Sequence, residues 1–164
     1  MIISASRPYF APFPGFFYQA NLCDIFVILD TVQFPRRTTW INRNRFKNDQ
    51  GTLWIPVWKK GLGMQRIDDV RICHDGRQAQ KQLLSLKQAY AHAPYLSDHL
   101  QFVENLFSTA FDRLIDFNMA VIRHLMLYLG ISTEIRRLSE LGIGARGDHL
   151  LVQICKYFKA TTYL

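Results

Sequence analysis

The side chains best suited to chemistry gather in one stretch of the sequence, between Asp30 and Lys47. The cations of this stretch are Arg36, Arg37, Arg43, Arg45 and Lys47. Interleaved with them are Gln33, Trp40, Asn42 and Asn44. Forked guanidinium donors, amides and an aromatic face together suit an anionic ligand that carries other polar groups. A nucleotide, a coenzyme or a charged sugar is such a ligand, and the sequence therefore predicts a substrate-binding site here.

The positive charge of the chain is local. The net charge is +7, and residues 30 to 60 hold seven basic residues against Asp30 and Asp49. The rest of the chain is nearly balanced. This concentration favours a local anion site over a generally basic protein. The alternative is a solvated basic loop that binds nothing.

Asp30 is the candidate catalytic residue. It directly follows the apolar run Ile25 to Leu29, and carboxylates at the carboxyl ends of parallel strands face the ligand crevice. We expect Asp30 to act as a general base or to orient the substrate. Its alternative role is an ion pair with Arg37.

Arg146 is a further candidate for substrate binding. The segment from Gly142 to Asp148 reads GIGARGD and precedes an amphipathic run, so it can hold an anion at the amino end of a helix. A flexible loop in which Asp148 caps the helix explains the same residues. The histidines show no metal-binding spacing, and no metal is predicted.

The hydrophobic pattern alternates between strands and helices. Apolar runs predict strands at 2–5, 25–29, 54–58, 67–72, 132–136 and 161–164, with the third and fourth forming an antiparallel pair. Helical spacing predicts helices at 15–21 and 148–158 and a helical segment around 76–129. This order predicts an α/β fold, a three-layer sandwich with a largely parallel sheet.

Length and composition bound the class of protein. A chain of 164 residues with 49% hydrophobic residues is expected to form one domain with a sizeable core. No apolar run reaches the length of a membrane span, and the amino terminus lacks the pattern of a secretory signal. A cytoplasmic location is therefore expected. The oligomeric state is not indicated.

Several segments resemble, in the same order, the WbqC-like protein family. They read SRPYFAPFPGFF, DIFVILDTVQFPRRTTWINRNRF, LWIPVWKKG, QAYAHAPYL and GARGDHLLVQIC. Family members carry Gln-Pro near the amino terminus where this chain has Arg7 and Pro8, a change that adds a positive charge to the expected binding loops. The resemblance implies a bacterial protein encoded among genes for surface polysaccharide, such as O-antigen, or for specialised small molecules.

The resemblance also bears on domain boundaries and on fold. It implies a single WbqC-like domain over residues 1–164 that lacks its C-terminal end, because members continue beyond the segment at Tyr163. The first strand, the Pro/Gly-rich loop and the short helix are similar to the start of nucleotidyltransferase-type folds, in which phosphates bind after the first strand. The histidine signature of that superfamily is absent here.

Two function classes follow. The first is a transferase or ligase that moves a group from an anionic activated donor, such as a nucleotide or a coenzyme A-type donor, to an amino sugar or amino acid. The second is a nucleic-acid-binding module, suggested by the pI near 9.5 and by the segment WINRNRF. A non-catalytic partner of a glycosyltransferase is a third possibility. We favour the enzyme, because duplex binding requires an extended basic stripe.

Overall fold

A four-stranded parallel sheet lies at the centre of the fold. The computed structural model describes residues 1–36, 39–61, 64–74 and 76–164. The strand order is β5-β2-β1-β6, and the strands are β1 (Ile2–Ser6), β2 (Ile25–Ile28), β5 (Glu134–Arg137) and β6 (Thr162–Tyr163). Every pairing in this sheet is parallel. The expected α/β class with a largely parallel sheet is confirmed.

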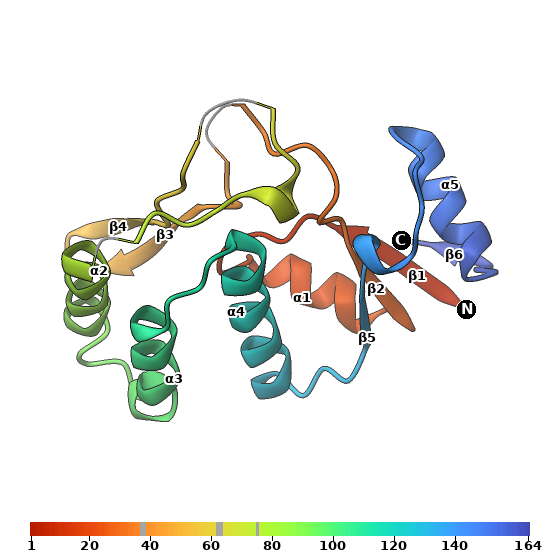
Figure 1. The fold of residues 1–164 in the computed structure, drawn as a ribbon. Coiled ribbons are helices and arrows are strands. Elements are labelled where there is room, and N and C mark those ends of the chain that lie inside the picture. The colour runs from red at the N-terminus through yellow and green to blue at the C-terminus, as the bar shows by residue number, and fades with distance from the viewer. Residues whose placement is uncertain (37–38, 62–63, 75) are drawn as a thin grey trace.

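Helices cover both faces of this sheet, so that α1 (Pro14–Asn21) and α4 (Leu114–Tyr128) lie on one side and α5 (Asp148–Tyr157) on the other (Figure 1). The four residues of β2 are all buried and divide between the two faces. Phe26 and Ile28 pack in the cluster with α1 and α4, whereas Ile25 and Val27 pack with α5. A strand buried on both faces reads as a continuous apolar run, which explains why IFVI was recognisable in the sequence.

The expected helical segment is present as α2 (Gly76–Ala89) and α3 (Leu96–Ser108), followed by α4. Pro94 lies in the turn between α2 and α3, where a helix cannot continue. The inner faces of α3 and α4 join Phe10, Phe34 and Ile55 in the largest hydrophobic cluster. This cluster packs against the loops that follow β1 and β2 and contains no residue of the parallel sheet.

Two sequence-based strand assignments are wrong. Residues 43 to 47, expected to be a loop, form β3 (Arg43–Asn48), which pairs antiparallel with β4 (Gly51–Pro56). The expected strand at 67–72 contains a short 3-10 helix, η1 (Ile67–Asp69), and the expected pair with 54–58 is reduced to a single bridge between Lys59 and Ile72. The sequence concealed this strand, because RNRFKN contains one apolar residue, Phe46, among basic and amide side chains.

Two side-chain amides join the antiparallel ribbon formed by β3 and β4 to the rest of the fold. Asn118 of α4 is fully buried, and its Nδ2 donates to the carbonyls of Pro8 (2.8 Å) and Ile41 (2.7 Å). Asn44 of β3 donates to the carbonyls of Phe10 (2.9 Å) and Ala11 (2.7 Å). The loop after β1 is therefore held between α4 and the ribbon.

Replacement of Asn118 by Ala should lower the free energy of unfolding by roughly 2 to 4 kcal/mol, because two buried carbonyls lose their donor. Urea unfolding followed by circular dichroism measures this loss. Asn105→Ala is the matched control, since Asn105 is exposed on α3, and it should change stability by less than about 0.5 kcal/mol. Equal midpoints for the two variants would show that the bridge contributes nothing.

Candidate functional site

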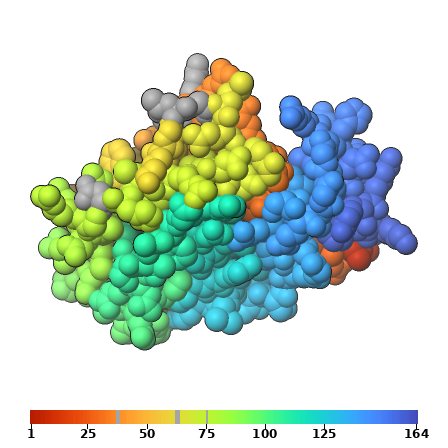
Figure 2. All heavy atoms as spheres, viewed as in Figure 1, coloured from red at the N-terminus to blue at the C-terminus, as the bar shows by residue number. Residues whose placement is uncertain are grey.

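A polar cleft lies at the carboxyl edge of the parallel sheet. It has a volume of about 740 Å³, within the range of ligand sites. Figure 2 shows it as the hollow between the segment around residue 65 and the segment that precedes α5. Its walls are residues 31–33 after β2, 64–66 beside η1, 138–139 after β5, and 142–147. Parallel strands end at one edge of a sheet, so the loops that follow β2 and β5 meet there.

This cleft brings together two of the predicted binding residues, Gln33 and Arg146. Both are exposed. A second guanidinium in the lining, that of Arg66, is already engaged by Asp68, to which its Nε and Nη2 donate at 3.0 and 2.6 Å. This bond raises the pKa of Arg66 further above its ordinary value. In the described part of the lining, Arg146 is thus the cation not engaged in an ion pair.

The loop from 142 to 147 lies open along the cleft. A Cβ built on Gly142, Gly144 or Gly147 would meet nothing within 4 Å. Among the described residues, the backbone N–H groups of 143–147 donate to no backbone carbonyl. Gly147 adopts φ 57° where the chain enters α5, a conformation that favours glycine. These N–H groups, the positive end of α5 and Arg146 are the donors that this wall can offer to an anion.

Asp30 lies at the base of this edge, but its carboxylate is not open to the cleft. It is 1% exposed. It accepts hydrogen bonds from the backbone N–H (2.9 Å) and the Oγ (2.6 Å) of Ser139. Asp30 therefore positions η2 (Leu138–Glu140), and Ser139 is the residue of the pair that lines the cleft. The sequence did not single out Ser139, because its partner lies 109 positions away.

The two predicted asparagines bind the protein's own backbone. Asn44 holds Phe10 and Ala11, as described above, and its Oδ1 accepts the N–H of Arg45. Asn42 donates to the carbonyl of Val57 at 3.3 Å. In this structure both side chains serve the ribbon, and neither lines the cleft. The observed bonds are structural, since short amides satisfy buried carbonyls, and the expected role of both asparagines in substrate binding stays a prediction.

Trp40, Arg43 and Arg45 form a separate group on the outer face of the ribbon, joined by Trp54 from β4. The indole rings of Trp40 and Trp54 stack with their centroids 5.6 Å apart. The guanidinium carbon of Arg43 lies 4.6 Å from the Trp54 ring, and that of Arg45 lies 5.5 Å from Trp40. The sequence did not indicate Trp54 as a member of this group, because its position opposite Arg45 follows from the strand register alone. Gln33 lines the cleft and these three residues do not, and their role in substrate binding stays a prediction.

Two further predicted arginines, Arg7 and Arg36, are described by the structure and are not among the lining residues of the cleft. Arg7 is exposed directly after β1, at the same edge of the sheet. Arg36 is exposed, and its Nη2 lies 2.9 Å from the sulfur of Met64, which is a lining residue. Arg37 lies outside the described residues, so its pairing with Asp30 stays a prediction.

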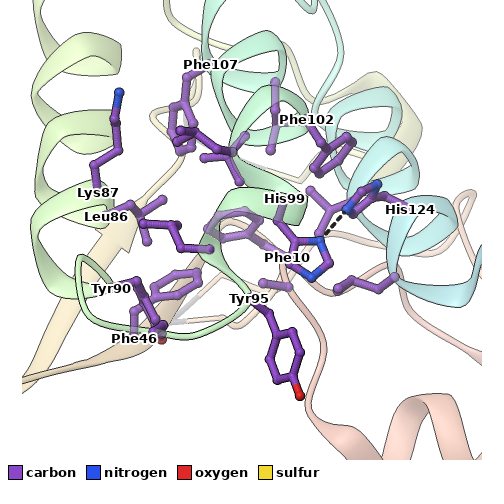
Figure 3. A pocket seen from close by; sticks show the side chains of 18 of the residues that line it. Phe10, Phe46, Leu86, Lys87, Tyr90, Tyr95, His99, Phe102, Phe107 and His124 are labelled. Atoms are coloured by element: carbon purple, nitrogen blue, oxygen red, sulfur yellow. Dashed lines mark hydrogen bonds between the residues drawn. The ribbon is translucent and has the colours of Figure 1, made fainter. Parts of the chain in front are cut away.

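A second hollow, of about 390 Å³, lies among α2, α3, α4 and β3 and is almost entirely apolar (Figure 3). Its polar lining includes Lys87 and a hydrogen bond of 3.0 Å between His99 Nδ1 and His124 Nε2. His124 also stacks on Phe102 at 3.6 Å. Burial, followed by the charge of His99, lowers the pKa of His124 below its ordinary value of 6.5.

Neither a metal-binding cluster nor a membrane-spanning helix is present within the described residues. No cluster of three or more His, Cys, Asp or Glu side chains suited to a metal ion occurs among them. None of the helices in the described ranges is long and apolar enough to cross a membrane.

Replacement of Asp30 by Ala should lower the free energy of unfolding by roughly 2 to 3 kcal/mol, because the N–H and hydroxyl of Ser139 lose their acceptor. Chemical denaturation measures the loss. Ser139→Ala keeps the bond from the backbone N–H and should cost less. An Asp30→Ala variant as stable as the parent protein would contradict the positioning role described here.

Acid should destabilise the protein through His124. Because its folded-state pKa is lowered, the unfolded chain binds the proton more readily, and stability falls as the pH drops below about 6.5. Urea unfolding at pH 8, 7, 6 and 5 measures this dependence. His124→Phe, which retains the ring stack, should flatten it between pH 7 and 5. His149→Ala, at an exposed position on α5, is the control and should leave the slope unchanged.

Comparisons with known proteins lead to the same family as the motifs of the sequence. No solved structure gives a significant match, so the nucleotidyltransferase-like fold stays a prediction. An uncharacterized protein of Mycobacterium tuberculosis is 28% identical over 159 residues, which cover 94% of this chain and 68% of that protein. The family model described as the WbqC-like protein family matches residues 7–164. With nearly its whole length matched, the chain belongs to the WbqC-like protein family.

Proposed function

We propose that this protein is an enzyme of bacterial surface polysaccharide (O-antigen) or specialised small-molecule biosynthesis. It transfers a group from an anionic activated donor to an amino sugar or amino acid. The observation that carries the proposal is the polar cleft at the carboxyl edge of the parallel sheet, which contains Gln33 and Arg146. Ligands of open α/β sheets bind at this edge. The family name, associated with polysaccharide biosynthesis loci, supports the metabolic setting.

The donor binds along the wall formed by residues 142–147. Its phosphate or carboxylate groups accept hydrogen bonds from the free N–H groups and from the guanidinium of Arg146. The amide of Gln33 reaches the same space from the opposite wall and suits a sugar hydroxyl or a base edge. A nucleotide or a coenzyme A-type molecule supplies both kinds of group, and the cleft volume accommodates such a donor.

Asp30 retains a catalytic assignment in this proposal, but it acts through Ser139. The Ser139 hydroxyl lines the cleft and donates to Asp30 Oδ2 at 2.6 Å, the short distance of a charge-assisted bond. An acceptor amine that attacks the donor must lose a proton. Ser139 Oγ accepts this proton as its own passes to Asp30, so Asp30 serves as the base one hydroxyl away.

The test is a ligand screen followed by substitution of Arg146. Thermal shifts with nucleotides, nucleotide sugars and coenzyme A identify the ligand class, and calorimetry then measures affinity. Arg146→Ala should weaken binding of the best ligand by roughly 1.5 to 3 kcal/mol, the scale of a charge-assisted hydrogen bond. Arg146→Lys should recover part of the loss if the contact is monodentate.

Arg123→Ala is the matched control. Arg123 is exposed on α4 and does not line the cleft, so its removal lowers the net charge equally without touching the site. The proposal fails if no anionic ligand shifts the melting temperature, or if both alanine variants weaken binding to the same extent. Binding that persists without turnover of the donor in the presence of amines would instead favour a non-catalytic partner of a glycosyltransferase.

A further inference from the structure

The ribbon formed by β3 and β4 has a basic and aromatic outer face that the proposed function does not use. Burial along β3 alternates from Asn44 onward, so Asn44, Phe46 and Asn48 lie on the inward face of the strand. The outward face of β3 carries Arg45 and Lys47, which are exposed, and Arg43, which is half-buried with its Nε enclosed. The acidic residue of this hairpin, Asp49, lies in the turn between the strands. None of the residues lining the cleft belongs to β3 or β4.

The aromatic part of this face consists of Trp40 and Trp54, whose side chains are 43% and 44% exposed. Trp54 lies directly opposite Arg45 in the strand register. The backbone of Trp40 is fixed, since its carbonyl accepts the N–H of Phe10 at 2.9 Å and the neighbouring Ile41 is fully buried. Large apolar rings are therefore held in water at defined positions, which costs free energy unless a ligand uses them.

We propose that this face binds single-stranded nucleic acid. Successive outward cations on a strand are about 6.8 Å apart, two residues of extended chain, so Arg43, Arg45 and Lys47 form a line that a phosphate backbone can follow. The stacked indoles next to this line provide the flat surface on which bases stack. Combined cationic and aromatic platforms of this kind bind single strands with little sequence preference.

The geometry favours nucleobases over sugar rings as the stacking group. The guanidinium of Arg43 lies 4.6 Å from the Trp54 ring, and that of Arg45 lies 5.7 Å from it. The platform thus presents guanidinium planes as well as indole planes. A base stacks on both kinds of plane, whereas a sugar ring packs its C–H groups against an aromatic face alone. Three cations in one line are too few for a duplex surface and suit a short single strand.

Titration of the full chain with oligothymidylates of one, four and eight nucleotides tests the proposal. Quenching of tryptophan fluorescence reports stacking, and anisotropy of a labelled octamer reports affinity. We expect quenching by the octamer, affinity that rises with length, and a slope of log affinity against log salt near −2, from about −0.7 for each of three phosphates.

Substitutions locate the site. Trp40→Ala should weaken octamer binding on the order of tenfold or more, and Lys47→Ala should reduce the salt slope by about 0.7. Lys156→Ala is the matched control, because Lys156 is exposed on α5, at the other end of the molecule from the ribbon (Figure 1). Melting temperatures of all variants show whether each is folded. Arg146→Ala should leave octamer binding unchanged, which separates this site from the cleft.

Four outcomes would overturn the proposal. The first is the absence of quenching and binding at 50 mM salt. The second is equal loss of affinity in Lys47→Ala and Lys156→Ala. The third is equal affinity for the mononucleotide and the octamer, which would identify a nucleotide site. The fourth is displacement of the octamer by an acidic polysaccharide at equal charge concentration, which would identify a general polyanion surface.

Discussion

The bridge made by Asn118 is the interaction on which the arrangement of the two sheets depends. One carboxamide, fully buried on α4, donates to the loop that leaves β1 and to the loop that leads into β3. Neither loop has a regular partner for those carbonyls, and a buried carbonyl without a donor is costly. Asn44 repeats the device from the ribbon side. The parallel sheet and the ribbon are thus joined by polar bonds within an apolar surrounding, and the positions of both candidate surfaces follow from this joint.

The basic segment after β2 divides between two surfaces because it changes from loop to strand. Gln33 stays with the loops that meet at the carboxyl edge of the sheet, where Ser139 and Arg146 arrive from β5 and from the start of α5. From Arg43 onward the chain is extended, and alternation sends successive side chains to opposite faces. Charge that is contiguous in sequence is therefore separated in space. The cleft has one cation without an ion pair among its described lining residues, and its capacity for anions rests as much on backbone N–H groups as on arginine.

Asp30 illustrates how a catalytic type of residue acquires its role from its surroundings. It occupies the position at the end of a parallel strand where carboxylates meet ligands. Burial and two hydrogen bonds from Ser139 make it the anchor of a turn, and Ser139 is the member of the pair that lines the cleft. The family to which the chain belongs supplies a biological setting but no reaction, and the chemistry is inferred from this arrangement.

The sequence by itself determined the parallel α/β core and the family. The IFVI run of β2 and the helical spacing of α4 are local patterns set by burial, and burial selects residue types directly. The sequence also indicated Gln33 and Arg146 as binding residues, each from its own segment of the chain. Only the tertiary structure decided that these two share a cleft, that Ser139 meets Asp30, and that Arg45 faces Trp54. Those relations join residues far apart in the chain or depend on strand register, and neither distance nor register is encoded in local periodicity.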